Sequence, residues 1–181
     1  MNKNKEKLTQ GLIQIYTGNA KGKSTAAFGL AVRAAGHGFK VIVIQFMKTG
    51  SYYGEIPGLK RLAPEVEIHS YGKEGFISQR GVTEEDISLA HKALAHAERA
   101  FADPETDILI LDEINNALYY ELLTVEEVLR FLDQKPEHVE VVMTGRNAPR
   151  ELIEKAHLVT EMKEIKHPYQ QGIASRKGIE Y

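Results

Sequence analysis

Short runs of apolar residues recur along the chain and are separated by polar or amphipathic stretches. Residues 41–44 and 108–111, for example, are apolar at every position. An uninterrupted apolar run of this length is typical of a strand buried on both faces of a parallel sheet. The pattern predicts six strands, at residues 11–16, 40–46, 66–71, 108–111, 139–144 and 157–160.

Helical patterns fill the segments between these strands. Residues 23–35 follow the first strand at once, and Gly36 marks the end of this helix, as glycine often does. Two capping-box sequences, at residues 83–86 and 124–127, predict the starts of two further helices. In the first of these, apolar residues recur every three or four positions, at Ile87, Ala90, Leu94, Ala97 and Phe101.

The remaining stretches complete an alternating order of strands and helices. Residues 47–59 and 72–81 are predicted as loops, and Pro149 suits the first turn of a short helix. Strands that alternate with helices form parallel βαβ units with right-handed crossovers. We therefore expect an α/β fold with a mostly parallel, doubly wound sheet of about six strands flanked by helices. A chain of 181 residues is short for two domains, so residues 1–181 are expected to form a single domain.

Composition excludes several classes of protein. A net charge of −2 argues against a surface that binds nucleic acid, which is usually strongly basic. The sequence has no run of about 18 apolar residues. Residues 1–5 also lack the apolar core of a signal peptide, so we expect a cytoplasmic protein without a membrane partner. Cysteine is absent, which excludes disulfides, thiolate metal sites and cysteine-bound iron–sulfur clusters. Any electrons that the chemistry requires must therefore come from elsewhere.

The segment between the first strand and the first helix indicates nucleotide binding. Its order of strand, glycine-containing loop and helix is the context of a phosphate-binding loop. The glycines let the backbone approach a phosphate, and the first N–H groups of the helix point at it from the positive end of the helix dipole. The Lys23 ammonium suits phosphate oxygens, and the Ser24 hydroxyl can reach a magnesium ion. The candidate nucleotide-binding residues of the loop are Gly18, Asn19, Ala20, Lys21, Gly22, Lys23, Ser24 and Thr25.

The loop is one residue shorter than the usual motif. Three residues separate Gly18 from Gly22, whereas the usual loop has four before its Gly-Lys pair. A loop of this length does not hold a triphosphate quite as a standard kinase or GTPase does. A glycine turn that only resembles a nucleotide loop is the alternative. Lys23, Ser24 and the strand–helix context favour nucleotide binding and a P-loop NTPase-like fold.

Further candidate residues follow two other predicted strands or lie on the first helix. Asp112 and Glu113 end a buried strand, where a carboxylate can bind magnesium directly or through water; the alternative is a pair of acids that starts a helix. Arg146 follows a later strand and can reach a phosphate or a leaving group, or it is a surface arginine. Arg33 is a nucleotide-binding candidate, with a solvated or paired arginine as the alternative. The histidines are too scattered to predict a metal site.

Several segments together resemble one protein family. Residues 16–29, with the same one-residue-short loop, resemble the phosphate-binding loop of the bacterial ATP:corrinoid adenosyltransferases, which act on cob(I)alamin or cob(I)yrinic acid a,c-diamide. The resemblance continues in order over nearly the whole chain. It includes Arg33-Ala34-Ala35-Gly36-His37-Gly38, Gln45-Phe46-Met47-Lys48, Leu111-Asp112-Glu113, Thr144-Gly145-Arg146, Lys166-His167-Pro168-Tyr169, Gly172-Ile173 and Lys177-Gly178-Ile179-Glu180-Tyr181.

The resemblance implies a reaction and a set of roles. In this family the 5′-deoxyadenosyl group of ATP is transferred to the Co(I) of a reduced corrinoid, triphosphate is released, and adenosylcobalamin or its precursor is formed. The loop would bind ATP in an orientation reversed from that of most such loops. Lys23, Arg146 and Glu113 would be the catalytic residues, and Mg²⁺ (or Mn²⁺) would be held by Ser24, Asp112 and Glu113.

The resemblance also implies partners and a corrinoid contact. Phe76 matches an aromatic residue that packs against the lower face of the corrinoid, whereas Ser78 stands in place of a second, tryptophan-like residue. Ala20 stands where the family often has a glycine. By resemblance, we expect a homodimer that receives electrons from an external donor such as flavodoxin or a flavin reductase.

Two other functions fit a phosphate-binding loop. One is a P-loop small-molecule kinase, in which Lys23 would serve the γ-phosphate and ADP would be a product. The other is a nucleotide-dependent switch that recruits a partner through residues 47–59. The short loop and the long collinear match favour the adenosyltransferase over both.

Overall fold

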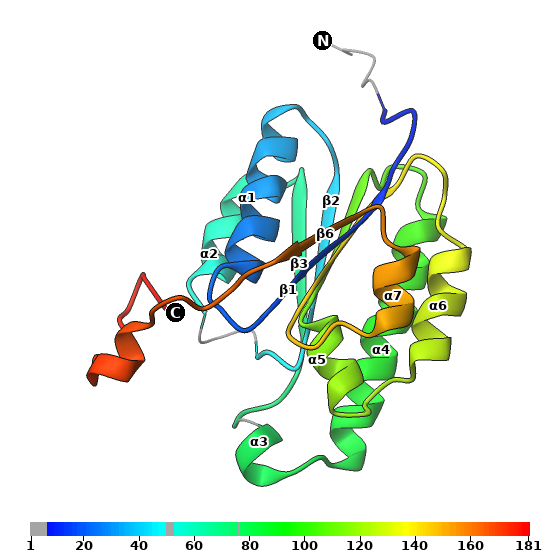
Figure 1. The fold of residues 1–181 in the computed structure, drawn as a ribbon. Coiled ribbons are helices and arrows are strands. Elements are labelled where there is room, and N and C mark those ends of the chain that lie inside the picture. Colours follow the sequence, from blue (N-terminus) through cyan, green and yellow to red (C-terminus); the bar gives the residue numbers. More distant parts are fainter. Residues whose placement is uncertain (1–6, 50–52, 76) are drawn as a thin grey trace.

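A six-stranded parallel sheet forms the centre of the molecule. The computed structural model describes residues 7–49, 53–75 and 77–181. The strands lie in the order β3-β2-β4-β5-β1-β6, and every neighbouring pair is parallel (Figure 1). They are β1 (Ile13–Thr17), β2 (Val41–Phe46), β3 (Val66–Tyr71), β4 (Ile108–Asp112), β5 (Glu140–Thr144) and β6 (Leu158–Glu161).

Helices cover both faces of this sheet. Figure 1 shows α1 and α2 on one side and α4, α5, α6 and α7 on the other. The predicted α/β fold with a doubly wound parallel sheet is therefore confirmed. The helical segments are α1 (Lys23–Gly36), α2 (Glu55–Leu59), η1 (Lys60–Leu62), α3 (Ile77–Arg80), α4 (Glu84–Ala102), α5 (Ile114–Tyr119), α6 (Val125–Asp133), α7 (Arg150–Lys155) and η2 (Pro168–Gln171), where η denotes a 3₁₀ helix.

The prediction of two loops was wrong in part. Residues 47–59 include α2, and residues 72–81 include α3. The sequence of α2 contains a proline and a glycine, so its intrinsic helix propensity is low. It forms because Ile56 and Leu59 are buried, each only 4% exposed. Tertiary packing thus overrides local preference in this segment.

The apolar core consists of two clusters, one on each side of the sheet. Successive side chains of a strand point to opposite faces. In β2, accordingly, Ile42 and Ile44 belong to the cluster that packs under α4 to α7, whereas Val41 and Val43 belong to the cluster under α1. Because both faces are covered, all residues of β2 are buried. This burial explains the uninterrupted apolar runs in the sequence.

The edge strand β6 is covered by few other residues. All four of its residues are exposed, whereas β2, β4 and β5 are buried throughout. Leu158 and Val159 are 43% and 41% exposed. The chain beyond β6 extends away from the sheet and returns beside the start of α1 (Figure 1).

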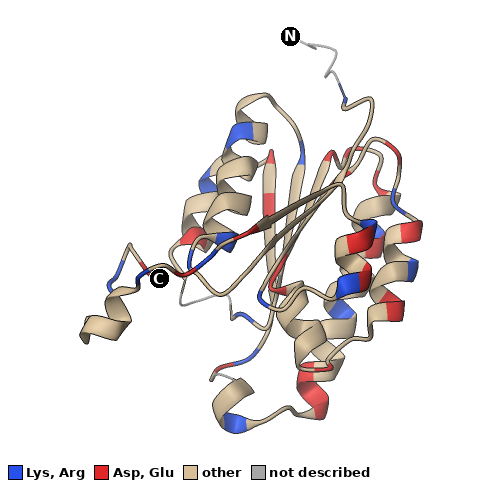
Figure 2. Cartoon of the chain, in the orientation of Figure 1, with Lys and Arg blue, Asp and Glu red and all other residues tan. Residues whose placement is uncertain are grey.

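The described helices carry charged residues of both signs (Figure 2). Figure 2 shows acidic and basic residues interspersed over the helices, which agrees with the small net charge of −2. Among the described residues, no helix combines the length and the apolar character that crossing a membrane requires.

Candidate active site

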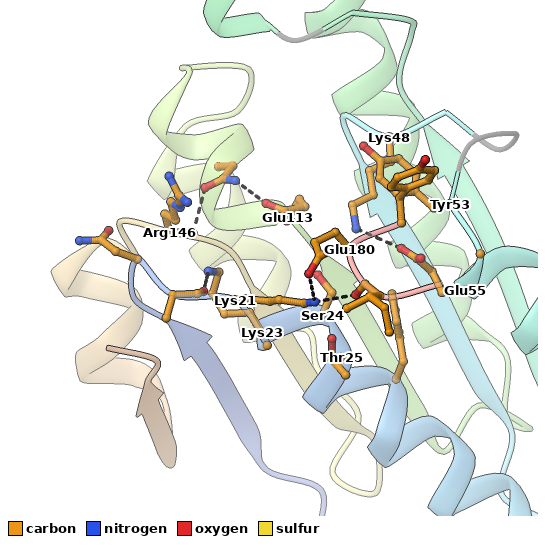
Figure 3. Close-up of a pocket in the computed structure, with 18 of the residues that line it drawn as sticks. Lys21, Lys23, Ser24, Thr25, Lys48, Tyr53, Glu55, Glu113, Arg146 and Glu180 are labelled. Carbon is orange, nitrogen blue, oxygen red and sulfur yellow. Dashed lines mark hydrogen bonds and ion pairs between the residues drawn. The ribbon is translucent and has the colours of Figure 1, made fainter. Parts of the chain in front are cut away.

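A cavity of about 1040 Å³ lies at the carboxyl edge of the sheet. Figure 3 shows side chains that line it. Parallel α/β sheets place their ligands at this edge. The volume is ample for a nucleotide, since pockets that bind drug-sized ligands measure about 300–1,000 Å³. Most of the cavity wall comes from segments that follow four of the strands. These are residues 19–25 after β1, Lys48 and 53–55 after β2, Glu113 and Asn116 after β4, and Arg146 after β5. Residues 178–181, near the end of the chain, complete this wall.

Two glycines shape the loop after β1. Gly18 and Gly22 have left-handed backbones, with φ of +96° and +117°. A Cβ atom at Gly18 would lie 2.4 Å from the carbonyl oxygen of Met162, directly after β6. The N–H of Ala20 donates to that same oxygen (3.0 Å). The loop backbone is therefore held against the end of β6, and only glycine fits where the two chains touch.

The loop delivers Lys23 and the start of α1 to the cavity. Lys23 is 8% exposed, and its Nζ donates to the carbonyl oxygens of Gly18 (2.9 Å) and Ala20 (2.7 Å). Burial lowers the pKa of Lys23. The 14-residue α1 has no side-chain cap and no acid in its first turn. A preorganised ammonium and uncapped N–H groups at a helix start suit a polyphosphate.

Asp112 lies beneath the cavity and is completely buried. Its Oδ2 accepts from Lys48 Nζ (2.8 Å) and Gln45 Nε2 (3.1 Å), and its Oδ1 accepts from the Thr144 hydroxyl (2.8 Å). The Ser24 hydroxyl also donates to this carboxylate. Burial opposes ionisation, but the Lys48 ammonium holds the pKa of Asp112 below its usual range.

Glu113 lines the cavity just above Asp112. Its backbone is left-handed (φ +66°), and its N–H donates to the Thr144 hydroxyl (2.9 Å). Asn116 Nδ2 donates to Glu113 Oε2. Burial, and then the charge of Asp112, raise the pKa of Glu113. The two carboxylates therefore differ: Asp112 is an interior anion with its own donors, and Glu113 is the one that faces the cavity.

Arg146 reaches the cavity from the end of β5. Its N–H donates to Asn116 Oδ1 (2.9 Å), which ties the segment after β5 to α5. Gly145 makes this approach possible, because a Cβ there would lie 2.9 Å from Asn115 Cβ. Arg146 thereby faces the same space as Lys23 and Glu113.

Most of the predicted site residues meet at this cavity. Gly18 supports the loop from behind, and Asp112 lies beneath the floor. Arg33 is in the last turn of α1 and is not among the residues that line the cavity. Phe76 lies outside the residues that the structure describes. The predicted residues that line the cavity are Asn19, Ala20, Lys21, Gly22, Lys23, Ser24, Thr25, Glu113 and Arg146.

The cavity is also lined by residues that were not predicted as site residues. Lys48, Tyr53 and Glu55 form a wall after β2 (Figure 3). A signal for Lys48 was present, because it follows the strand that contains the apolar run 41–44, at the carboxyl end of that strand, where Glu113 lies after its own strand.

Residues 176–181, here called the tail segment, form another part of the wall. Lys21 Nζ donates to the Ile179 carbonyl oxygen (2.5 Å) and to Glu180 Oε1 (3.1 Å). Arg176 also pairs with the Glu180 carboxylate (3.1 Å). Arg176 foremost, and Lys21 to a lesser extent, lower the pKa of Glu180 to about 2. The tail segment therefore places one acid directly on a lysine of the phosphate-binding loop.

The oxygen donors of the cavity fit magnesium better than a metal that needs a protein cage. Among the described residues, no group of three or more His, Cys, Asp or Glu side chains is arranged to hold a metal. Mg²⁺ typically keeps water and substrate phosphates as ligands and uses only one or two protein oxygens. Ser24 and Glu113 both line the cavity and are two oxygen donors suited to that purpose.

Comparisons with known proteins agree with this geometry. A family model described as ATP:corrinoid adenosyltransferase BtuR/CobO/CobP matches residues 9–181. A corrinoid adenosyltransferase from Pseudomonas aeruginosa is 40% identical over 172 residues, which cover 95% of this chain and 84% of that protein. One from Sinorhizobium sp is 42% identical over 174 residues, covering 95% and 81% of the two chains. One from Escherichia coli K12 is 37% identical over 172 residues, covering 95% and 86%. With a match that runs from the strand before the phosphate-binding loop to the tail segment, the chain belongs to the ATP:corrinoid adenosyltransferase family.

Proposed function

We propose that the cavity binds ATP with its triphosphate on the loop after β1 and transfers the 5′-deoxyadenosyl group to a reduced corrinoid, with residues 1–181 acting as one domain. The observation that carries the assignment of the site is the convergence of Lys23, Arg146 and the uncapped start of α1 on one cavity. Three sources of positive potential around one space match a leaving group with several negative charges.

The reaction needs no proton acceptor. The Co(I) electron pair attacks C5′ of ATP, the C5′–O bond breaks, and its electrons leave with the triphosphate, while cobalt is formally oxidised by two electrons. Since Co(I) has no proton to lose, a general base would contribute nothing. The protein has to align C5′ with cobalt and stabilise charge on the departing oxygen.

The side chains divide this work. Lys23, Arg146 and the loop amides bind and stabilise the triphosphate, and one such donor typically contributes about 10²–10³ in rate. Ser24 and Glu113 would hold Mg²⁺ (or Mn²⁺), which would neutralise phosphate charge. Asp112 supports the metal site through Ser24, because all its oxygens are engaged inside the protein.

The remaining roles concern partners and the corrinoid. We assign Phe76 to the lower face of the corrinoid, and Arg33, in the last turn of α1, to indirect support of the nucleotide through that helix. An external donor such as flavodoxin or a flavin reductase would supply electrons in the cytoplasm. A homodimer is supported by the exposed apolar side chains of β6, Leu158 and Val159.

Product analysis tests the proposal. The protein is incubated anaerobically with ATP, Mg²⁺ and chemically reduced cob(I)alamin, and the phosphates are separated by ion exchange. We expect one triphosphate for each adenosylated corrinoid. ADP formed without corrinoid as the main product would contradict the proposal, since a kinase or ATPase breaks a bond to phosphorus.

A further inference from the structure

Lys48 lines the cavity, and none of the roles above uses it. The residue before it, Met47, has a left-handed backbone (φ +61°), and its N–H donates to the Tyr71 carbonyl oxygen (2.8 Å). This conformation is uncommon for a residue other than glycine, so the chain turns sharply where β2 ends. The Lys48 side chain is only 12% exposed. Figure 3 shows it beside Tyr53 and Glu55. A lysine this buried requires an explanation.

Four side chains surround the Lys48 ammonium. Its Nζ lies 2.8 Å from Asp112 Oδ2 and 3.5 Å from Glu55 Oε1. The ring centroid of Tyr53 is 5.0 Å away and that of Phe28 is 5.9 Å away, both within the range of cation–π interactions. The ammonium is thus fixed between the sheet and the cavity wall.

Lys48 is one of four donors that hold the Asp112 carboxylate. Gln45 and Thr144 donate from the sheet, and Ser24 donates from the first turn of α1. Lys48 is the cation of this set, and a buried carboxylate needs a partner charge. With four donors, Asp112 has no oxygen left for a metal and acts on the site through its neighbours.

Ser24 is the neighbour that matters for the nucleotide. A hydroxyl has one proton and two lone pairs. Because its proton is donated to Asp112 beneath the floor, its lone pairs are left for a cation in the cavity, which Ser24 lines. If the carboxylate shifted, the hydroxyl would be free to rotate and its oxygen would lose that orientation.

We propose that Lys48 is a positioning residue for the metal–nucleotide site. Its ammonium neutralises and fixes Asp112, which in turn orients the Ser24 oxygen toward the cavity. Through Glu55 and Tyr53 it also fastens the wall after β2 to the same point. The inference rests on the proposed function only in taking Ser24 as a metal ligand.

The test measures metal binding apart from catalysis. Mn²⁺ binding to the protein–ATP complex is followed by the paramagnetic resonance signal of free Mn²⁺, without corrinoid. ATP binding in the absence of metal is measured by equilibrium dialysis. For Lys48→Met we expect the Mn²⁺ dissociation constant to rise about 10–100-fold, the range typical of losing an outer-shell partner. The metal-free ATP dissociation constant should change less than about twofold, and Lys48→Arg should restore part of the Mn²⁺ affinity.

Controls separate positioning from a general loss of charge. Lys40→Met removes an ion-paired lysine from the opposite end of β2, where its partner is Glu67, and should leave both constants unchanged. In a Ser24→Ala background, Lys48→Met should have no further effect on Mn²⁺ affinity, because both changes act on one ligand. If Lys48→Met fails to fold, Lys48→Met with Asp112→Leu replaces the buried pair by apolar groups, and it should bind Mn²⁺ as weakly as Ser24→Ala.

The outcomes are distinguishable. Normal Mn²⁺ affinity in Lys48→Met, or in the double variant, would overturn the inference and leave the proposed function intact. Loss of metal-free ATP binding would overturn it as well and make Lys48 a direct phosphate contact. A wild-type protein that bound neither ATP nor Mn²⁺ would instead contradict the proposed function.

Discussion

Lys21 and Lys23 are two residues apart in one loop but differ in their surroundings. The Lys23 ammonium is buried and bonded to carbonyls of its own loop, whereas the Lys21 side chain is 46% exposed and pairs with Glu180. A fixed cation contributes most to a transition state, because its orientation costs nothing during the reaction. Lys23 is therefore the residue on which turnover should depend.

Replacing Lys23 with alanine should lower turnover at saturating ATP about 10²–10³-fold, the usual cost of removing one preorganised donor. The measurement is triphosphate release with prereduced corrinoid, together with a thermal melt to verify folding. Lys92→Ala, an exposed lysine on α4, is the control. Near-normal turnover of Lys23→Ala would contradict the assignment of this loop to triphosphate binding.

Glu113→Gln should raise the Mg²⁺ concentration needed for half-maximal activity about 10–100-fold, because the cavity loses its one charged oxygen donor of the proposed metal site. Activity is titrated with Mg²⁺ at fixed ATP. The exposed Glu126 of α6 supplies the control, Glu126→Gln. An unchanged Mg²⁺ requirement would assign Glu113 to the start of α5 alone.

At the scale of elements, the parts that the sequence predicted are those whose signals are local. The strand–loop–helix around Lys23 and the capping boxes of α4 and α6 each lie within a few consecutive residues, and the structure shows both boxes. Lys48 meets Asp112 across 64 positions, and Lys21 meets Glu180 across 159. Such contacts depend on strand order and on the path of the tail segment, which no short pattern encodes.

The tail segment should reduce ATP affinity, because Glu180 competes with phosphate oxygens for Lys21. Glu180→Gln is expected to lower the ATP dissociation constant about two- to fivefold, the scale of an exposed ion pair. Glu164→Gln, which alters an acid that contacts Gln170 and not Lys21, is the control. Weaker ATP binding by Glu180→Gln would show that the acid supports the site.

The start of α4 should make stability depend on pH. Asp86 accepts from Arg80 (2.6 and 2.7 Å) and from the N–H of Thr83 (2.9 Å), and Arg80 first among these holds the pKa of Asp86 well below its usual range. The folded pKa is lower than the unfolded value of about 3.9, so unfolding takes up a proton below about pH 4. The free energy of unfolding therefore decreases as the pH is lowered through this range.

Asp86→Asn should accordingly cost about 2 kcal/mol at pH 7, the loss expected for hydrogen bonds to a charged group. The difference from wild type should shrink as the pH falls below about 4. Urea unfolding at a series of pH values gives both quantities. Glu85→Gln, which removes the partner of Lys73 at the surface, should cost less than about 1 kcal/mol. A pH-independent difference would contradict the ion-pair explanation.

At the scale of the whole molecule, the order of strands in the sheet determines which side chains come together in the active site. Because β2, β4, β5 and β1 are neighbours in the sheet, their four carboxyl ends lie together. This order brings Thr17 to Ala148, 131 positions away, and Glu113 to Thr144, 31 positions away. Right-handed crossovers restrict the possible orders but do not select one. The alternating pattern was therefore enough to predict the sheet. Which residues line the cavity could be learned only from the three-dimensional structure.

The contact of the phosphate-binding loop with Met162 links two distant properties of the molecule. Loop and sheet edge share hydrogen bonds, from Ala20 to Met162 (3.0 Å) and from Met162 to Thr17 (2.8 Å). Linkage is reciprocal, so a ligand on the loop and a partner on the sheet edge that affect each other's binding do so by the same free energy. Amides of β6 should then exchange with deuterium more slowly when inorganic triphosphate is bound. Conversely, a molecule that binds to β6 would change the affinity of the loop for the nucleotide, although β6 lies outside the cavity.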